Sequence, residues 1–403
     1  MRAPSFFLCF VAAVVAESVV ATDYDDPVKL SARAWWNNAG WLETELWTVR
    51  DDVYPNNLAN FYLIDSPYGT FKARGDKQLL GRLREIEAIH QLRNKDALES
   101  GGEGTLDFAK DKIGVAEDLI EDPETFVEDI PRGARALLRR AGSNLLKERR
   151  KGAYSSDNAV QSLLGADDRK RALAAKLQVD PYTDNQILQK ELDRVATVKA
   201  LPEFGVGFFI PGNSFFTVLD AGESARVADA YLSSPSDLFV KNRRAMLDDF
   251  GVSKNVAAEF LSREFVTPAQ QSILVQSLAT LSGATGRDLF IELSLNATTR
   301  HEFDFYRRNA ELLAWYNQNR KRITAISSFK GLPLATDQSG ARVFPFSVDL
   351  AGWCPDCGGI LTDFADAGNG GVVLMSGRAT DRTKRELASR GIELVFVPSF
   401  GNF

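Results

Sequence analysis

Two cysteines lie three residues apart near the C-terminus, in the run Trp353-Cys354-Pro355-Asp356-Cys357. A cysteine at the start of a helix meets backbone N–H groups that lack helical partners, and these groups favour the thiolate. A second cysteine one turn further on can attack a mixed disulfide and release its product. The pair is therefore a candidate catalytic dithiol, a local structural disulfide, or half of a zinc site.

Other chemistry-bearing patterns are scarce. The two histidines, His90 and His301, are isolated, and neither lies in an HExxH arrangement, so the sequence predicts no metal site. The chain has no Walker, dinucleotide-binding or GxSxG motif, and we expect no cofactor. With 48 basic and 54 acidic residues among 403, the net charge is −6, which gives no reason to expect nucleic acid as a partner. The sequence leans against an enzyme, with Cys354 and Cys357 as its catalytic candidates, and it leaves open a hydrolase that uses scattered carboxylates.

The N-terminus has the pattern of a secretory signal peptide. Arg2 precedes an apolar run from Phe6 to Ala16, and small residues follow up to Ala21. We expect residues 1–21 to be removed, with cleavage after Ala21 in preference to Ala16, and Cys9 to leave with them. The predicted location is therefore the periplasm or cell envelope, where a disulfide between the two remaining cysteines is favoured.

The C-terminal segment, residues 331–403, has to position the cysteine pair. A Gly-rich loop over 331–340 is followed by alternating apolar runs and helical patterns, which predict a small α/β layer with parallel strands. The cysteines fall at its first strand-to-helix junction. The expected strands are Val343–Val348, Gly371–Met375 and Ile392–Val397, and the expected helices are Gly359–Ala367 and Thr380–Arg390.

Residues 343–397 resemble a thioredoxin-like segment, with a strand, then WCxxC, then a helix and another strand. The resemblance implies that Cys354 is the attacking thiol and Cys357 the resolving thiol, while Trp353 and Pro355 shape the loop. It also implies a thiol–disulfide oxidoreductase activity. The likeness departs from that family after Pro398, because too few residues follow to form its hairpin and last helix.

The aromatic-rich region 22–100 is predicted to contain a β-hairpin and a helix. Asn60–Asp65 and Thr70–Arg74 flank the turn residues 66–69, and a helical apolar stripe runs from Asp76 to Arg93. The tryptophans of this region are expected to be buried in the core. A polar, Gly-rich linker is predicted over 94–104.

Residues 105–155 are predicted to form charged amphipathic helices. An acidic stretch precedes a basic one, and apolar residues recur at helical spacing through the basic part: Leu137, Leu138, Ala141, Leu145 and Leu146. The basic helix could lie on an anionic membrane surface, or pair with the acidic one as a solvated hairpin. The residues of the candidate membrane surface are Arg132, Arg135, Arg139, Arg140, Lys147, Arg149, Arg150 and Lys151.

Residues 156–330 are predicted to form a helical domain. Capping boxes mark starts at Thr183 and Thr267, and the longest helix is expected from His301 to Phe329. The apolar stretch Phe204–Leu219 is interrupted by Pro-Gly-Asn and predicts a buried hairpin. The expected fold is therefore mainly α with a small β-hairpin near the N-terminus and a small C-terminal α/β layer, α+β overall.

The chain as a whole, notably Tyr62–Asp76, Asp180–Leu192 and Ser376–Val395, resembles a family of uncharacterised exported bacterial proteins. That resemblance implies an envelope location and assigns no catalytic residue. The sequence favours a non-enzymatic envelope protein that acts through a protein partner or contact with an anionic membrane. The alternative is a thiol–disulfide oxidoreductase that uses Cys354 and Cys357.

Overall fold

A computed structural model of the chain describes residues 24–25, 30–55, 59–99, 137–138, 140–141, 168–197, 221–368 and 370–397. Helices account for 52% and strands for 19% of the structure. The prediction of a mainly helical fold with a small hairpin and a small C-terminal layer is therefore wrong, because the described part contains several sheets. The largest is a five-stranded mixed sheet in the C-terminal region.

The five-stranded sheet has the order β12-β10-β8-β7-β6. The pairs β8–β10 and β10–β12 are parallel, which confirms the predicted β-α-β-α-β run, and β6–β7 and β7–β8 are antiparallel. The bounds of these strands and of the two crossover helices are β6 Ile323–Phe329, β7 Leu332–Asp337, β8 Arg342–Phe346, α13 Pro355–Asp366, β10 Gly371–Met375, α14 Asp381–Ser389 and β12 Ile392–Phe396.

Two of these strands replace elements that the sequence predicts differently. The helix expected to reach Phe329 ends at Asn319, and β6 takes up the remaining residues. The predicted loop over 331–340 contains β7. The tight turn between the two strands places Lys330 at φ 51° and Gly331 at φ 80°. Such a turn needs two residues at positive φ, and a lysine in the first position conceals the hairpin signal.

The N-terminal region forms a three-stranded antiparallel sheet covered by a long helix. The predicted hairpin is confirmed as β4 (Phe61–Ser66) and β5 (Gly69–Arg74), and β2 (Thr48–Val49) pairs with β4. Helix α2 runs from Asp76 to Glu99, so it occupies the first part of the expected linker. The expected burial of tryptophans is confirmed for Trp35, Trp36 and Trp47.

Shorter elements complete the N-terminal region. Two of the helices, α5 and α6, share the N-terminal core with α2, through Leu173 and Leu188 among others. These elements are β1 (Leu30–Ser31), α1 (Ala32–Trp35), the 3-10 turn η1 (Gly40–Leu42), β3 (Asp52–Val53), α5 (Asp168–Lys176) and α6 (Gln186–Ala196). The side chain of Asn185 caps α6, which corrects the expected cap at Thr183.

The third region is a layer of helices. The capping box predicted at Thr267 is confirmed at the start of α10. None of the helices in the described part of the chain is long and apolar enough to cross a membrane. The elements are α7 (Ala221–Leu232), α8 (Pro235–Arg244), the π-turn η6 (Ala245–Asp249), α9 (Lys254–Leu261), α10 (Pro268–Ala279), α11 (Arg287–Ser294) and α12 (Arg300–Asn319).

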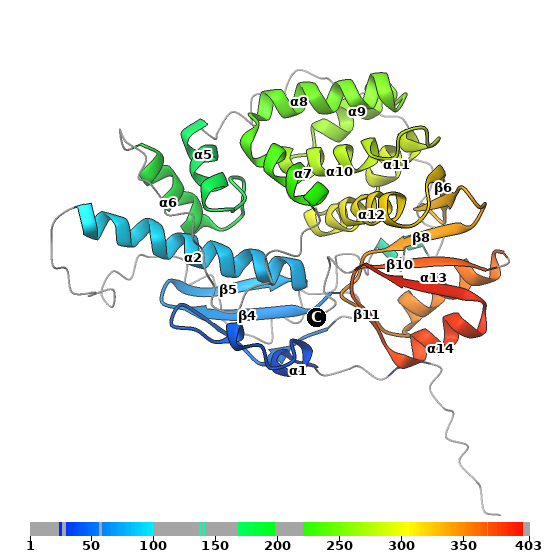
Figure 1. The fold of residues 1–403 in the computed structure, drawn as a ribbon, viewed down its shortest axis with the longest axis horizontal. Coiled ribbons are helices and arrows are strands. Elements are labelled where there is room, and N and C mark those ends of the chain that lie inside the picture. Colours follow the sequence, from blue (N-terminus) through cyan, green and yellow to red (C-terminus); the bar gives the residue numbers. More distant parts are fainter. Residues whose placement is uncertain are drawn as a thin grey trace, which may run out of the picture.

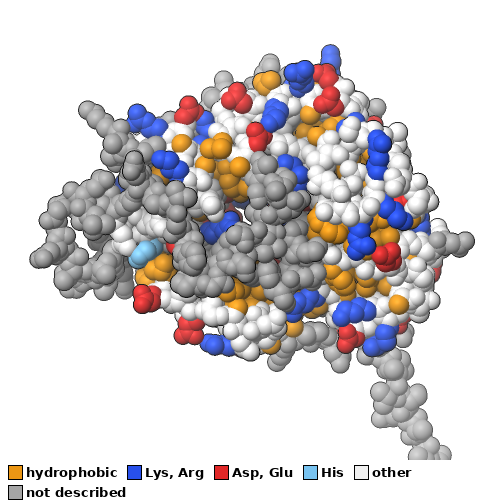
Figure 2. All heavy atoms as spheres, viewed as in Figure 1, with side chains coloured by type: hydrophobic (Ala, Val, Ile, Leu, Met, Phe, Trp, Pro, Cys, Tyr) orange, Lys and Arg blue, Asp and Glu red, His pale blue; other side chains and the backbone are white. Residues whose placement is uncertain are grey.

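Helix α12 joins the helical layer to the C-terminal sheet. In Figure 1 it lies against the sheet on the side opposite α14. One apolar core spans both parts, and its aromatic contacts include Phe305–Phe346 at 6.4 Å and Phe344–Phe364 at 5.2 Å between ring centroids. Charges of both signs are interspersed over the described surface shown in Figure 2. The core therefore fixes the positions of β8 and β10, and with them the loops that follow their carboxyl ends.

Candidate functional site

The cysteine pair lies at the strand-to-helix junction that the sequence predicts. Cys354 is the N-cap of α13, with Pro355 in the first helical position. The Cys354 Sγ accepts the backbone N–H of Cys357 at 3.4 Å. The structure contains no disulfide bond between the two residues. The sulfur of Cys354 therefore already occupies the acceptor position that a thiolate would take at a helix N-terminus.

Burial restricts access to this pair. Cys354 is 5% exposed, Cys357 is fully buried and Trp353 is 6% exposed. A folded protein cannot bring a surface disulfide onto a sulfur enclosed in this way without opening the loop.

A segment from the N-terminal end of the chain ties down the loop that carries the cysteines. The backbone N–H of Asp25 donates to the carbonyl of Trp353 at 2.8 Å. In return, the carboxylate of Asp25 accepts the N–H of Trp353 at 2.6 Å and the hydroxyl of Thr380 at 2.7 Å. Thr380 is also the N-cap of α14. One aspartate thus connects the turn before α13 to the start of α14.

A buried carboxyl group, Asp76, lies at the boundary between the N-terminal region and the C-terminal sheet. Its Oδ1 accepts hydrogen bonds from the Tyr62 hydroxyl at 2.6 Å and from Asn60 Nδ2 at 2.9 Å. Its Oδ2 accepts the indole N–H of Trp35 at 2.8 Å. Burial raises the pKa of Asp76 even though these three donors favour its ionised form.

A second buried carboxyl group, Asp349, follows β8 and meets the first. Its Oδ2 accepts the backbone N–H groups of Asn60 at 2.9 Å and of Asp76 at 3.1 Å. Arg308 Nη1 lies 3.8 Å from Asp349 Oδ1. Burial, followed by the charge of Asp76, raises the pKa of Asp349 to about 7. The positive charge of one guanidinium balances the two carboxyl groups when they share one proton and carry a single negative charge.

Spare polar atoms surround this junction. Asn60 Oδ1, Asn309 Nδ2 and Ser347 Oγ are buried, and each lacks a hydrogen-bond partner in the described part of the protein. Asn309 Oδ1 accepts the backbone N–H of Ser347 at 3.0 Å, so these two residues are adjacent. Buried polar groups normally have partners. The carboxyl ends of the parallel strands, where α/β folds bind ligands, therefore carry unused hydrogen-bonding capacity.

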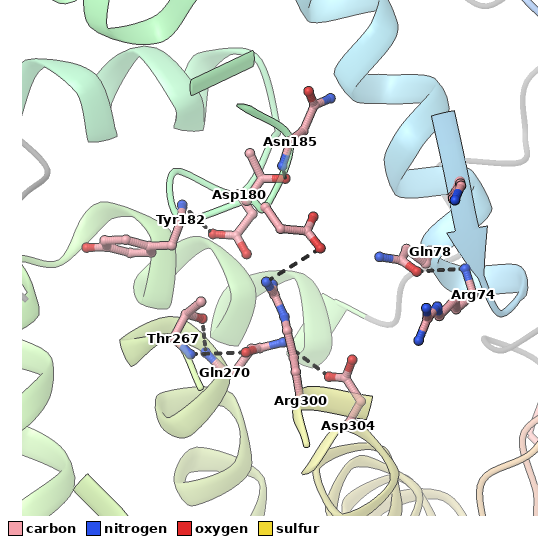
Figure 3. A network of polar contacts seen from close by, with 12 residues as sticks. Arg74, Gln78, Asp180, Tyr182, Asn185, Thr267, Gln270, Arg300 and Asp304 are labelled. Carbon is pink, nitrogen blue, oxygen red and sulfur yellow. Dashed lines mark hydrogen bonds and ion pairs between the residues drawn. The ribbon is translucent and has the colours of Figure 1, made fainter. Parts of the chain in front are cut away.

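Another polar network, shown in Figure 3, connects three regions of the chain. Asp180, in the loop before α6, is half-buried, and desolvation raises its pKa to about 6. Arg300, in the first turn of α12, lies 3.8 Å from Asp184. Gln270 of α10 donates to Asp304 of α12 at 3.3 Å. These contacts hold the α6 loop, α10 and α12 together, and we assign them a structural role.

Neither the protein-family models, nor the curated proteins, nor the solved structures contain a match to this chain. The likenesses to thioredoxin-like segments and to exported bacterial proteins therefore stay predictions, as does the expected export. The function has to be argued from the chemistry of the site itself.

A metal centre finds no support in the described residues. No group of three or more His, Cys, Asp and Glu side chains in these residues is arranged to hold a metal ion. His90 bonds to Tyr68 at 2.7 Å through Nδ1 and to Asn94 at 2.7 Å through Nε2. Within this part of the chain, no third side chain of these types is placed beside Cys354 and Cys357 to form such a group.

The carboxyl pair is the part of the site that sequence reasoning missed. Asp76 and Asp349 are 273 positions apart, so no spacing rule could have connected them. Two features could have flagged them individually. Asp76 opens a long predicted helix, and Asp349 follows a strand that runs into a βα junction, where polar residues gather.

The basic segment predicted to contact membranes lies mostly outside the described residues, and so do the expected hairpin over 204–219 and residues 1–21. Of its eight basic residues only Arg140 is described. Leu137, Leu138 and Ala141 are fully buried in the core that includes the helical layer. The apolar face formed by these three residues is therefore covered by protein, and membrane contact stays a prediction for the rest of the segment.

Replacing Arg140 with alanine is expected to lower the free energy of unfolding by about 1–3 kcal/mol. Arg140 Nη2 lies 2.8 Å from the carboxylate of Glu302, whose side chain is 1% exposed. The truncation leaves that carboxylate buried without its guanidinium. Urea denaturation measures the change, and Arg244→Ala, which removes an exposed arginine at 3.9 Å from Asp248, is the matched control. Equal stability of the two variants would contradict the assignment.

Proposed function

We propose that the protein carries out thiol–disulfide exchange at Cys354 and Cys357 with a low-molecular-weight disulfide. The observation that carries the proposal is the capping geometry, with the Cys354 sulfur at the N-terminus of α13 and Cys357 in its first turn. The burial of both sulfurs supports a small partner over a protein. The function that the sequence favours, a non-enzymatic envelope protein acting through contacts, stays a prediction.

The exchange balances without a further reactant. The Cys354 thiolate attacks one sulfur of the small disulfide, a Cys354–S bond forms, and the first thiolate leaves and takes up a proton. Cys357 then loses its proton and attacks Cys354 Sγ, which releases the second thiolate. The protein dithiol is oxidised to a disulfide by two electrons, and the small disulfide is reduced to two thiols.

The first test follows the reaction of the reduced full chain with oxidised glutathione as the probe. We expect wild-type protein to lose both thiols, Cys354→Ser to slow the reaction by more than about 100-fold, and Cys357→Ser to accumulate a mixed disulfide. Intact-mass measurement after acid quenching distinguishes these products. Ser389→Ala, an exposed change at the end of α14, serves as the control.

Two results would reject the proposal. Wild-type protein whose thiols stay unmodified under native conditions but react in denaturant would show a buried, inert pair. Reaction of Cys354→Ser at the wild-type rate would show that this sulfur is not the nucleophile.

A further inference from the structure

A cavity lies directly beside the cysteine turn. Its volume is about 360 Å³, and its walls come from Trp353 and from helices α13 and α14. This volume is within the range of sites for small ligands. Tyr24, which is 41% exposed, forms part of its edge and precedes the aspartate that ties down Trp353.

Two glycines form part of the α13 wall of the cavity, beside Thr362 and Asp363. A Cβ on Gly358 would lie 3.1 Å from Cδ2 of Trp353, so the indole packs directly on the helix backbone. A Cβ on Gly359 would have no heavy atom within 4 Å, so this position faces open space. Trp353 thus lines the cavity and packs on α13, and Cys354 is the next residue in the chain.

The α14 side of the cavity carries charges of both signs. Arg390 pairs with Glu386 at 2.5 Å, and its guanidinium lies 5.6 Å from the ring centre of Trp353. Arg382 adds a second guanidinium to the lining. On the α13 side, the carboxylate of Asp363 also lines the cavity and bonds to Lys330. Guanidinium groups recognise carboxylates, and the two acidic side chains suit an ammonium group.

We propose that this cavity binds the small disulfide that the cysteine pair reduces, and that this disulfide is a zwitterionic amino acid or short peptide derivative. Its carboxylate lies against Arg382 and Arg390, its ammonium against Glu386 or Asp363, and its sulfurs pass the edge of Trp353 toward Cys354. The inference rests on the proposed exchange reaction, and it adds the place and the chemical class of the substrate.

Binding can be measured apart from reaction. The full chain with Cys354→Ser and Cys357→Ser is titrated calorimetrically with oxidised glutathione and with S-methylglutathione, a thioether that cannot exchange. We expect both probes to bind, and Gly359→Leu, which fills the cavity, to weaken binding by at least about 10-fold. Gly81→Leu is the matched control, because a Cβ on this helical glycine of α2 also meets nothing within 4 Å.

The outcomes separate this inference from the exchange reaction. Binding that Gly359→Leu leaves unchanged, or that Gly81→Leu weakens equally, would overturn the cavity as the site. If the double serine variant binds neither probe while the wild-type protein still exchanges, the cavity is also rejected as the site, but the exchange reaction is not. If Gly359→Leu alone blocks binding and the wild-type protein does not exchange, the ligand site is supported and the exchange reaction is rejected.

Discussion

Replacing Asp349 with alanine is expected to lower the free energy of unfolding by about 2–6 kcal/mol. Asp349 Oδ2 accepts the backbone N–H groups of Asn60 and Asp76, which belong to the N-terminal region. Its removal leaves two buried donors unsatisfied, and each costs about 1–3 kcal/mol. Asp366→Ala, which removes an exposed aspartate of α13, should change stability by less than about 0.5 kcal/mol.

The isosteric variant Asp349→Asn tests the protonation of the pair. Its carbonyl oxygen can still accept both N–H groups, so we expect a much smaller loss than with alanine. Because burial raises the pKa of Asp349 to about 7, the folded state holds a proton that the unfolded state releases near pH 4. Wild-type stability should therefore fall relative to Asp349→Asn as the pH rises from about 4 to 7, and stay level above that.

Urea unfolding of the two proteins at a series of pH values measures this difference directly. Groups with a lowered pKa, such as Asp304 and Asp337, contribute stability that grows with pH. These contributions are the same in both proteins and cancel in the difference. A difference that does not change between pH 4 and 7 would show that Asp349 ionises normally in the folded protein. A loss in Asp349→Ala no larger than in Asp366→Ala would reject the junction as a stabilising contact.

Local patterns in the sequence predict much of the local structure around the cysteines. Alternating apolar runs and Thr380 as a cap give the three parallel strands and helix α14, and Cys354 falls at a helix N-terminus as expected. These elements depend on hydrogen bonds between near neighbours and on faces with a fixed period. The prediction fails at β6, expected as the end of a helix, and at β7, expected as a loop, because strand pairing and the turn at Lys330 override the local pattern.

The long-range part of the site could not be predicted from the sequence. The contact of Asp25 with Trp353 spans 328 positions, and that of Asp349 with Asn60 spans 289. Such contacts follow from how whole layers pack, and a single sequence carries no local signal for them. The cavity could not be predicted either. Its α13 wall includes two glycines, but the cavity forms only because α14 packs beside α13.

Gly377→Ala is expected to lower the free energy of unfolding by about 3 kcal/mol or more. Gly377 follows β10, and a Cβ there would lie 2.1 Å from the carbonyl oxygen of Asp349 and 2.4 Å from that of Val348. Both obstacles are backbone atoms, which cannot rotate away as a side chain can. The turn after β8 would have to move, although Arg378 N and Ser376 Oγ hold it at 2.7 and 2.9 Å.

A glycine with space around its Cβ position is expected to gain stability when it is replaced with alanine. Gly81 lies inside α2 with nothing within 4 Å of its Cβ position, so Gly81→Ala should raise stability by about 0.5–1 kcal/mol through its higher helix propensity. Urea denaturation of the two variants and the wild type gives both values.

Because Asp349 lies between β8 and the cysteine turn, Gly377→Ala should also alter the thiol reactivity of Cys354, whereas Gly81→Ala should not. A Gly377→Ala protein as stable as wild type would show that these two turns do not touch in solution.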